Sequence, residues 1–502
     1  MIPTSAITNM QSRKFKEVEH YQSPSRDYFL LPFKFHRISV EKEVIVNEVG
    51  DFLVVPTGTT TRIVAGEINS GSVSDQELYA DLIANFFISE SALPDLIEVL
   101  ATRYRTKKSF LDYFTSLHIF VMSLRCEHTC HYCQVSRVTS DKNKYDMSRL
   151  HIEAGIRLMM KSPNPHVTME FQGGEALLAF ENIVYAVEKA KIEAEKYEKK
   201  ITYVVCTNLA LLTDEMLLYF HENKMLISTS LDGPSFIHNK NRHKPNASSH
   251  QLAVEGIKRC REILGSEHVS ALVTTTTLSL EYPEEIVDEY VALAFRNIFL
   301  RPISPYGFAT RNKDRNKYEA EKFLEFYKKA LGRIIQYNMD GYFIREDYAS
   351  IILKKLLTPF PVGYVDLQSP AGLVNNVIVF NYDGAVYASD EARMLAEMND
   401  FTFKLGTLGE NTYEEIFYGN KVAALSEVMT NESLPGCSEC AFQAYCGVDP
   451  VFNHATQGDL IGHRPTSSFC QRNMEIIRYL IALMDKDKKI EKIFRSWITG
   501  KS

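Results

Sequence analysis

Seven of the nine cysteines in this chain gather in two short segments, and thiols clustered in this way bind metal more often than they form disulfides. The first segment holds Cys126, Cys130 and Cys133, in the spacing C-x3-C-x2-C. A loop this short can give thiolates to three irons of a [4Fe–4S] cubane, which leaves the fourth iron open to another ligand. A zinc site is the alternative, because His128 and His131 lie within the same loop and histidine also binds zinc.

The second segment has the spacing C-x2-C-x5-C and is completed by a cysteine farther along the chain. Its members are Cys437, Cys440, Cys446 and Cys470. Four thiolates form a closed site, in which no metal position stays open for a substrate. Such a site serves electron transfer or structural support. The same spacing fits a structural zinc knuckle, so both metals are candidates at this point.

The composition is that of an ordinary globular protein. The length of 502 residues suggests about three domains. An apolar content of 45% and a charged content of 24% exclude a collagen-like, coiled-coil or wholly disordered chain. A net charge of −7 without a basic block argues against a nucleic-acid partner. We find neither an apolar run of a membrane helix's length nor a secretory signal, and therefore expect a cytoplasmic protein with no membrane partner.

Short apolar strands alternate with amphipathic helices through the middle of the chain. The expected strands are residues 117–124, 167–171, 201–206, 226–230, 270–276 and 298–301. The expected helices between them are residues 148–161, 182–199, 214–223, 251–264 and 283–294. This alternation predicts a parallel sheet with right-handed crossovers. Six β/α units suit a partial, open version of the eightfold barrel, whose sites lie at the carboxyl ends of the strands.

The two ends of the chain do not show this alternation of strands and helices. Two strand-like runs, 28–38 and 43–55, precede helical patterns at 75–88 and 92–105. Toward the C-terminus, Asp383-Gly384 between apolar runs at 377–380 and 385–387 predicts a hairpin. Amphipathic helices are expected at 317–337 and 473–484.

The first cysteine motif, with the aromatic Tyr132 directly before its third cysteine, resembles the signature of the radical S-adenosylmethionine (SAM) superfamily. The resemblance implies that Cys126, Cys130 and Cys133 hold a [4Fe–4S] cluster with one open iron, to which S-adenosyl-L-methionine binds. It also implies that reductive cleavage of SAM gives a 5′-deoxyadenosyl radical.

A second motif of that family matches Gly173-Gly174-Glu175, at the end of the second predicted strand. In the family this segment holds the methionine amino group of SAM. A backbone without Cβ atoms allows close approach, and a carboxylate suits an ammonium group. Ala176 stands where the family often has proline, a minor departure. Outside this context, a Gly-Gly-Glu turn would be only a strand-to-helix connection.

Ser230, at the end of the fourth predicted strand, and Arg242 match residues that contact the SAM carboxylate in peptide-modifying members of the family. A hydroxyl and a guanidinium fork both suit a carboxylate. A surface ion pair is the alternative for Arg242. Looser candidates for lining the site are Thr207, Asn208 and Arg301. Candidate proton carriers are Glu170 and Asp232, each with a structural carboxylate as the alternative.

The second cysteine group resembles the C-terminal extension called SPASM, which has seven cysteines and two auxiliary [4Fe–4S] clusters. Three of its cysteine positions are occupied here by Ala371, Ser389 and Pro450, although the glycine of the pattern is kept as Gly384. In the family, the three missing cysteines are ligands of the first auxiliary cluster. The four that survive ligate the second. The resemblance therefore implies one auxiliary [4Fe–4S] cluster, ligated by Cys437, Cys440, Cys446 and Cys470.

Short segments along almost the whole chain are similar to the His-Xaa-Ser system radical SAM maturases, the HxsB family. They are Leu30–His36, Asn47–Gly50, Tyr104–Phe110, Tyr132–Ser136, Phe171–Glu175, Val205–Asn208 and Asp390–Leu395. The resemblance implies a precursor peptide with short repeats as substrate and a second, HxsC-like radical SAM protein as heterodimer partner. It also implies a cellular reductant such as flavodoxin or ferredoxin. Related paired maturases form carbon–carbon bonds within side chains, including cyclopropane rings.

The implied architecture is an α/β fold: a partial (β/α)6 radical SAM barrel between a small N-terminal α+β domain and a C-terminal SPASM-like domain. The expected parts are a flexible N-terminus (1–25), a winged-helix-like peptide-recognition or docking domain (26–111), the barrel (112–315), a helical bridge (316–365), the auxiliary cluster domain (366–475) and a C-terminal helix and tail (476–502). Winged-helix-like domains add a leader peptide to a sheet edge. A docking surface for a partner or a structural cap are the alternatives for residues 26–111.

Two other functions stay open at this stage. One is a non-catalytic subunit that binds precursor and partner, which the loss of one auxiliary site favours slightly. The complete set of cysteine, Gly-Gly-Glu and Ser/Arg motifs favours an active enzyme instead. The other is a sulfatase-type SPASM maturase, which differs only in its substrate.

Overall fold

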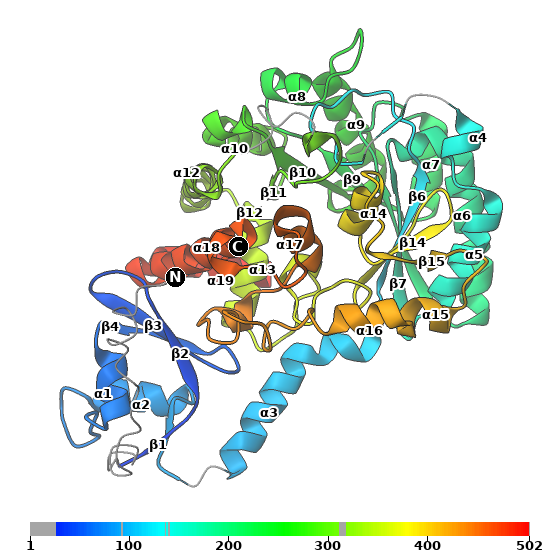
Figure 1. The fold of residues 1–502 in the computed structure, drawn as a ribbon. Coiled ribbons are helices and arrows are strands. Elements are labelled where there is room, and N and C mark those ends of the chain that lie inside the picture. The colour runs from blue at the N-terminus through cyan, green and yellow to red at the C-terminus, as the bar shows by residue number, and fades with distance from the viewer. Residues whose placement is uncertain (1–26, 92–93, 136, 139–140, 311–317, 501–502) are drawn as a thin grey trace, which may run out of the picture. The chain divides into compact units, whose positions relative to one another are not determined.

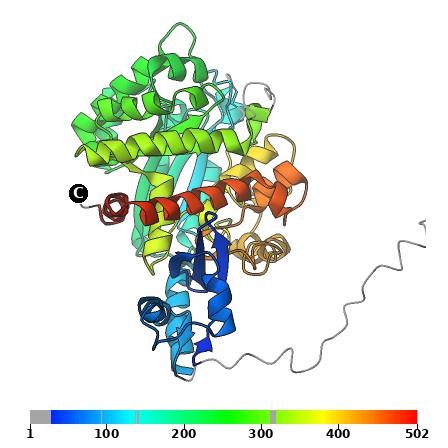
Figure 2. The same ribbon diagram turned by 90° about the vertical axis from the view of Figure 1, so that its left-hand side faces the viewer.

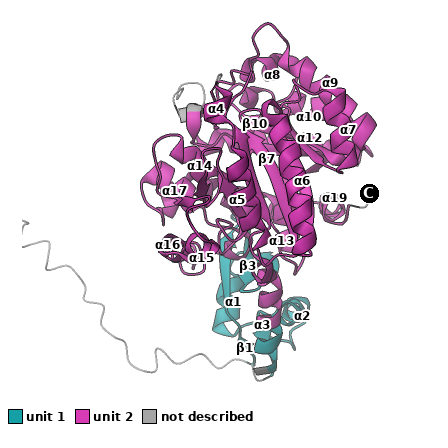
Figure 3. Ribbon diagram, turned by 90° about the vertical axis from the view of Figure 1, so that its right-hand side faces the viewer, with its two compact units in different colours: residues 1–99 teal, residues 100–502 magenta. Residues whose placement is uncertain are grey.

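The computed structural model describes residues 27–91, 94–135, 137–138, 141–310 and 318–500. The chain divides into two units, residues 1–99 and residues 100–502 (Figure 3). The division falls within helix α3 (Pro94–Lys108), before the expected boundary at 111/112. The C-terminal part of α3 belongs to the larger unit because Tyr104 and Lys108 both contact the carboxylate of Glu432, Tyr104 at 2.9 Å. The expected flexible N-terminus, residues 1–25, lies outside the described residues.

The smaller unit places a three-stranded antiparallel sheet, in the order β2-β3-β4, beside two helices. Its elements are β1 (Phe29–Leu30), β2 (Phe33–Arg37), β3 (Lys42–Asn47), β4 (Phe52–Pro56), α1 (Thr59–Ala65), α2 (Gln76–Ala84) and β5 (Ile88–Ser89). The core is apolar and includes Ile45, Ile63 and Leu82. The single strand expected over 43–55 is in fact the β3–β4 hairpin, because the Asn47 side chain accepts hydrogen bonds from the backbone of Val49 and Asp51 and turns the chain.

Six parallel strands form the centre of the larger unit, as the sequence predicted (Figure 1). They are β6 (Leu117–Ser123), β7 (His166–Gly173), β8 (Lys200–Cys206), β9 (Leu226–Ser230), β10 (Val269–Thr275) and β11 (Asn297–Pro302). The predicted helices between them are confirmed as α5 (Arg149–Met160), α6 (Phe180–Lys196), α7 (Asp214–Glu222), α9 (Ser249–Leu264) and α10 (Pro283–Ala292). Three of these helices begin where a side-chain oxygen caps the first turn, at Ser148, Thr213 and Ser248.

The C-terminal region extends the same sheet. The predicted hairpin is confirmed as β13 (Val377–Phe380) and β14 (Ala385–Tyr387), and β15 (Lys404–Thr407) follows. Strand β13 pairs in parallel with β6, so a single ten-stranded sheet runs from β12 (Arg345–Glu346) to β15. The rings of Phe120 on β6 and Phe380 on β13 lie 5.0 Å apart, and Gly155 of α5 packs directly against both. The barrel and the C-terminal region therefore share one core.

Long helices cover another part of this unit. Helix α12 (Ala320–Met339) lies beside α18 (Ser468–Lys486), and α13 (Asp347–Leu357) and α19 (Lys488–Thr499) pack against them (Figure 2). Helix α18 starts earlier than the predicted residue 473, because the Ser467 side chain caps it by accepting a hydrogen bond from Cys470 N. Other short helices are α4 (Lys142–Tyr145), α8 (Ser235–Asn241), α14 (Asp390–Ala396), α15 (Tyr413–Tyr418), α16 (Asn420–Ser426) and α17 (Pro450–Gln457). No described helix is long and apolar enough to cross a membrane.

Truncation of Phe380 tests the shared core. Because this side chain is fully buried between β6, β13 and α5, Phe380→Ala leaves a cavity and lowers the free energy of unfolding by about 3–5 kcal/mol. Phe360→Ala is the matched control, because Phe360 is 59% exposed and its loss changes stability by less than about 0.5 kcal/mol. Urea unfolding followed by circular dichroism measures both variants. Equal midpoints for the two would contradict the shared core.

Candidate functional site

The first cysteine loop begins at the carboxyl end of β6, the first barrel strand. Cys126 is buried, whereas Cys130 and Cys133 are partly exposed. The loop is tied to the segment that follows helix α8: Thr129 N donates a hydrogen bond to the carbonyl oxygen of His243 at 2.7 Å. Cys126 N donates to the carbonyl of Val138 at 2.9 Å. The three predicted ligands therefore lie on a loop that is fixed by its backbone.

The two glycines of the Gly-Gly-Glu segment hold that loop at its start. Gly174 N donates to Ser123 O at 2.7 Å, and Glu175 N donates to Arg125 O at 2.8 Å. A Cβ atom on Gly173 would lie 2.0 Å from Ser123 O, and one on Gly174 would lie 2.4 Å from Arg125 O. Gly173 also has φ +152°, which favours glycine. The close approach that these glycines permit is thus to the backbone that leads into Cys126.

The Glu175 side chain is buried and points between the ends of β7 and β8. Its carboxylate accepts hydrogen bonds from Leu177 N at 3.0 Å, Thr207 Oγ1 at 2.6 Å and Asn208 N at 2.8 Å. Burial, and then the nearby carboxylate of Glu127, raise the pKa of Glu175 to about 7. Thr207 and Asn208, two looser candidates, are therefore brought to this site. A contact of Glu175 with the amino group of SAM stays a prediction.

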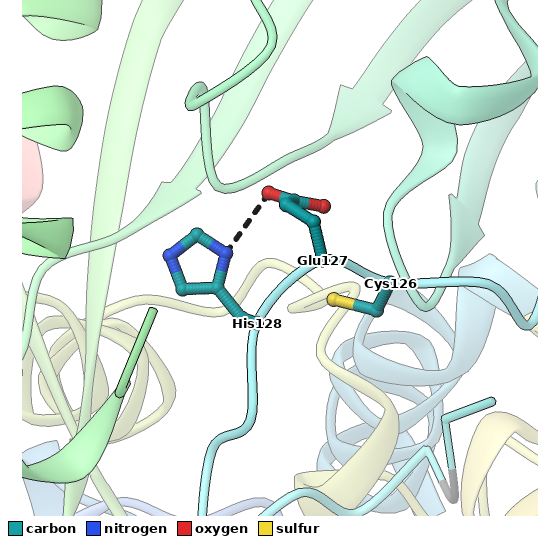
Figure 4. Close-up of side chains that lie close together, drawn as sticks. All are labelled: Cys126, Glu127 and His128. Carbon is teal, nitrogen blue, oxygen red and sulfur yellow. Dashed lines mark hydrogen bonds and ion pairs between the residues drawn. The ribbon is translucent and has the colours of Figure 1, made fainter. Parts of the chain in front are cut away.

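A buried polar chain that the sequence did not reveal surrounds the loop. Glu127 Oε1 lies 2.9 Å from His128 Nδ1 and accepts a hydrogen bond from Asn208 Nδ2 at 2.9 Å (Figure 4). His128 Nε2 lies 2.8 Å from Ser249 Oγ, which lies 3.1 Å from His238 Nε2. Glu127 and His128 are neighbours within the cysteine motif, whereas Asn208, His238 and Ser249 come from distant segments that no spacing could have grouped with them. Both nitrogens of His128 are thus engaged in hydrogen bonds, which disfavours the zinc alternative for this histidine.

Arg242 reaches the loop through a buried carboxylate. Asp232 Oδ2 accepts a hydrogen bond from the Tyr132 hydroxyl at 2.7 Å and lies 3.3 Å from Arg242 Nε. The Arg242 guanidinium also lies over the Tyr132 ring, 5.4 Å from its centroid. The ion pair considered for Arg242 is therefore present, but it is buried beside the cysteine loop and not on the surface. Ser230 lies on the same side of the sheet, partly exposed at the end of β9.

The four C-terminal cysteines converge from three segments. Cys437 and Cys440 lie in one loop, Cys446 follows a short turn of 3-10 helix, and Cys470 lies in the first turn of α18. Burial, and then the neighbouring thiols of Cys440, Cys470 and Cys437, raise the pKa of Cys446 to about 12. Asn473 Nδ2 lies 3.9 Å from Cys446 Sγ. The predicted ligands are thus gathered at one place.

Cations surround this second group of thiols. The Lys355 ammonium donates hydrogen bonds to the carbonyl oxygens of Leu367 and Cys446, the latter at 3.1 Å. Burial lowers the pKa of Lys355 to about 7, while the Cys446 thiol opposes that shift. Burial raises the pKa of Cys437, whereas Arg464 lowers it. A cluster with four thiolate ligands carries negative charge, and these cations suit it.

Among the described residues, the only three potential ligand atoms within 4.8 Å of one another belong to Cys126, Glu127 and His128. This group contains a single cysteine, so the metal that each group of thiols binds stays a prediction.

A cavity that opens to solvent lies at the carboxyl end of β11, against the C-terminal region. Its wall includes Arg301, another looser candidate, and Tyr306. The neighbouring Gly307 packs tightly on the cysteine loop, because a Cβ atom there would lie 2.2 Å from Gln134 O and 2.8 Å from Cys133 O. The cavity therefore adjoins the first cysteine group.

The same cavity also adjoins the second cysteine group. Its wall residue Tyr348 donates a hydrogen bond to Asn473 Oδ1 at 2.5 Å, and Asn473 in turn contacts Cys446 Sγ. Another wall residue, Arg472, lies two positions after Cys470 on α18. Residues that contact or neighbour each cysteine group therefore lie in or beside the wall of the cavity.

Comparison with known proteins agrees with this geometry. Residues 120–290 match the radical SAM superfamily. The chain is 24% identical over 323 residues to a cysteine-type anaerobic sulfatase-maturating enzyme of Clostridium perfringens, covering 61% of this chain and 80% of that one. It is 28% identical over 131 residues to the radical SAM cyclopropyl synthase TigE of Paramaledivibacter caminithermalis, covering 24% of this chain and 27% of TigE.

A solved structure shows the same fold. Native anSMEcpe with bound AdoMet and Kp18Cys peptide superposes with a TM-score of 0.61 at 19% identity, covering 76% of this chain and 99% of that chain. Residues 120–290 therefore match the radical SAM superfamily, and the chain has the radical SAM α/β fold with a mostly parallel central sheet. The relatives support an enzyme.

Substitution of Gly174 tests how the first site is held. In Gly174→Ala, the new Cβ collides with the carbonyl oxygens of Arg125 and Leu124, which displaces the start of the cysteine loop. We expect iron bound after anaerobic reconstitution to fall from about eight to about four per chain, because only the C-terminal site still assembles. Gly332→Ala is the control, since nothing lies within 4 Å of its Cβ position. Full iron content in Gly174→Ala would show that the loop does not depend on this contact.

Proposed function

We propose that this protein is a radical SAM maturase that modifies residues of a ribosomally synthesised precursor peptide. The observation that carries the proposal is the cysteine loop at the end of β6, locked by Gly173 and Gly174 inside a radical SAM domain. When bound, the first cluster and SAM supply one-electron cleavage of SAM to methionine and a 5′-deoxyadenosyl radical, which takes a hydrogen atom from the peptide. Geometry contributes most of this chemistry, because the reacting groups are held side by side.

The residues of this chain have separate tasks in that reaction. The thiolates of Cys126, Cys130 and Cys133 bind three irons and leave the fourth open for SAM. Arg242 and Ser230 bind the SAM carboxylate. Asp232 and Tyr132 orient the Arg242 guanidinium; their hydrogen bond and the 3.3 Å contact of Asp232 with Arg242 support this role. Gly173-Gly174-Glu175 lies against the methionine end of SAM.

We further propose that Cys437, Cys440, Cys446 and Cys470 would hold one auxiliary [4Fe–4S] cluster, which would supply an acceptor for the electron left after the substrate radical couples. The convergence of the four thiols and the adjacent Lys355 support this assignment. Asn473, which links the wall of the cavity to Cys446, supports a short electron path.

The finer identity that we propose is a maturase of the HxsB type. Its substrate is a precursor peptide with short repeats, its partner a second, HxsC-like radical SAM protein, and its reductant flavodoxin or ferredoxin in the cytoplasm. The product contains a new carbon–carbon bond such as a cyclopropane ring. The motifs that resemble the HxsB family support this proposal, and the similarity to TigE over 131 residues supports the bond type.

The N-terminal unit is proposed to bind the leader of the precursor. Strands β2 and β4 are the two edges of its three-stranded antiparallel sheet. An extended peptide can add to such an edge through backbone hydrogen bonds. Phe35 of β2, which is 56% exposed, offers an apolar contact beside that edge.

A sulfatase-type maturase is the second candidate, and the 24% identity to the Clostridium perfringens enzyme favours it. The two candidates share the chemistry at Cys126 and differ in the substrate. A neighbouring reading frame that encodes a repeat-bearing peptide, and conversion of that peptide in vitro, would support the HxsB assignment. Conversion of a sulfatase peptide instead would overturn it.

Removal of the first three thiols tests the enzyme itself. In the variant Cys126→Ala/Cys130→Ala/Cys133→Ala, we expect iron to fall from about eight to about four per chain and reductive formation of 5′-deoxyadenosine to cease. Cys260→Ala is the control, because this lone buried cysteine lies in α9 away from both groups. Iron analysis and mass spectrometry after dithionite reduction give both readouts. Wild-type protein that fails to cleave SAM would instead support a non-catalytic subunit.

Removal of Cys437 and Cys446 tests the second site. For Cys437→Ala/Cys446→Ala, we expect iron to fall from about eight to about four, while 5′-deoxyadenosine still forms from SAM. Turnover of the peptide is lost because the leftover electron has no exit. Retained iron together with loss of one zinc per chain would identify the site as a zinc knuckle and refute the electron-transfer role.

A further inference from the structure

The cavity at the end of β11 has an unusual arrangement of charge. Three carboxylates and two guanidiniums belong to its wall, and each is partly exposed. They are Asp366, Glu391, Asp449, Arg301 and Arg472. Among the described residues, no ion pair within 4.0 Å joins any of these guanidiniums to any of these carboxylates. Tyr364, and then Asp366 and Glu391, raise the pKa of Arg301, and Asp449 also accepts a hydrogen bond from Phe452 N at 2.9 Å. The charges of the wall therefore offset one another only in part.

A buried hydroxyl in the same wall also lacks a partner. Tyr306 is 1% exposed and lines the cavity, and its hydroxyl forms no hydrogen bond with any described residue. Buried polar atoms are almost always hydrogen-bonded in native proteins, so such an atom indicates a missing ligand. Tyr306 precedes Gly307, which packs on the backbone of Cys133. The missing partner would thus sit beside the first cysteine group.

The sign of the charge indicates what the cavity binds. Carboxylates outnumber guanidiniums in its wall, and they repel one another. Burial, and then Asp366, raise the pKa of Asp449 to about 7. Burial, and then Asp366, raise the pKa of Glu391 to about 8. A cation between these carboxylates would relieve both effects.

The surroundings favour an organic cation over a metal ion. No three potential ligand atoms of this wall lie within 4.8 Å of one another in the described part of the chain. The rings of Phe299, Tyr348 and Tyr364 stand close together in the wall, with Tyr348 and Tyr364 centroids 6.0 Å apart. Aromatic faces attract ammonium and guanidinium groups.

The position of the carboxylates relates to the cysteines that this chain lacks. Glu391 lies two residues after Ser389, and Asp449 lies one residue before Pro450; both Ser389 and Pro450 stand where the SPASM pattern has cysteine. Helices α14 and α17, which begin at these positions, pack against each other. Polar lining residues thus occur beside two of the three replaced ligand positions.

We propose that this cavity, with Asp366, Glu391 and Asp449 in its wall, binds a basic side chain of the substrate peptide. The proposal rests on the proposed function and specifies its substrate: the peptide carries an arginine, lysine or protonated histidine close to the carbon from which hydrogen is removed. Tyr306 donates or accepts a hydrogen bond at that side chain or at its peptide group.

The test compares two small probes that differ in charge and little in shape, N-acetyl-arginine amide and N-acetyl-citrulline amide. Reconstituted protein with SAM and without reductant is dialysed against each probe, and bound probe is measured by mass spectrometry. We expect the arginine probe to bind at least about tenfold more tightly than the citrulline probe. In Asp366→Asn/Glu391→Gln that preference disappears.

The control variant Glu262→Gln/Glu427→Gln removes the same two charges at exposed positions and keeps the preference. Iron content and circular dichroism verify that both variants fold. Equal binding of the two probes to wild-type protein, binding of neither at 10 mM, or a preference that survives in Asp366→Asn/Glu391→Gln would each overturn the proposal. The proposed function is tested separately, by SAM cleavage after dithionite reduction, so its failure would leave this comparison of the two probes unaffected.

Discussion

The contact between two glycines and the end of strand β6 is the constraint on which the site depends. Gly173 and Gly174 lie so close to the backbone of Ser123 and Arg125 that a Cβ on either would collide with a carbonyl oxygen. Across this close contact, the backbone N–H groups of Gly174 and Glu175 donate hydrogen bonds to Ser123 O and Arg125 O. Backbone contacts of this kind leave little freedom, because neither partner has a rotamer to change. The position of Cys126 is therefore set by two neighbouring parallel strands and not by the loop alone.

A buried hydrogen-bond chain extends this constraint to the other strands. The backbone N–H of Asp232 can only donate, and it donates to His238 Nδ1 at 3.2 Å. Burial holds the pKa of His238 well below its usual value, so the neutral ring carries its proton on Nε2 and donates to Ser249 Oγ. Ser249 then donates to His128, whose Nδ1–H faces Glu127. Both histidines thus have one consistent role, which favours a single arrangement of the loop, while Glu127 Oε2 is buried without a hydrogen bond to a described residue.

The sequence predicted those features that repeat locally and missed those assembled from distant single residues. Strand and helix periods located the six barrel strands, because each buried face leaves its pattern within one element. The cysteine spacings likewise lie within short segments. Ser249 and His238, in contrast, belong to different helices and have no motif. The apolar run at 43–55 concealed a hairpin, because the turn depends on the single side chain of Asn47.

The cavity is the feature that joins the two halves of the larger unit. On one side, Tyr306 and Gly307 connect its wall to the backbone of Cys133. On the other side, Tyr348 reaches Cys446 through Asn473, and α18 presents both Cys470 and Arg472 within its first turns. A substrate bound in this cavity would lie between the two cysteine groups. The first is where the radical is proposed to form, and the second is proposed to accept the electron. Because β13 pairs directly with β6, one continuous sheet keeps these two places at a fixed separation. The C-terminal region therefore acts as a structural part of the barrel's site, and two of its replaced cysteine positions lie beside polar groups that line the cavity.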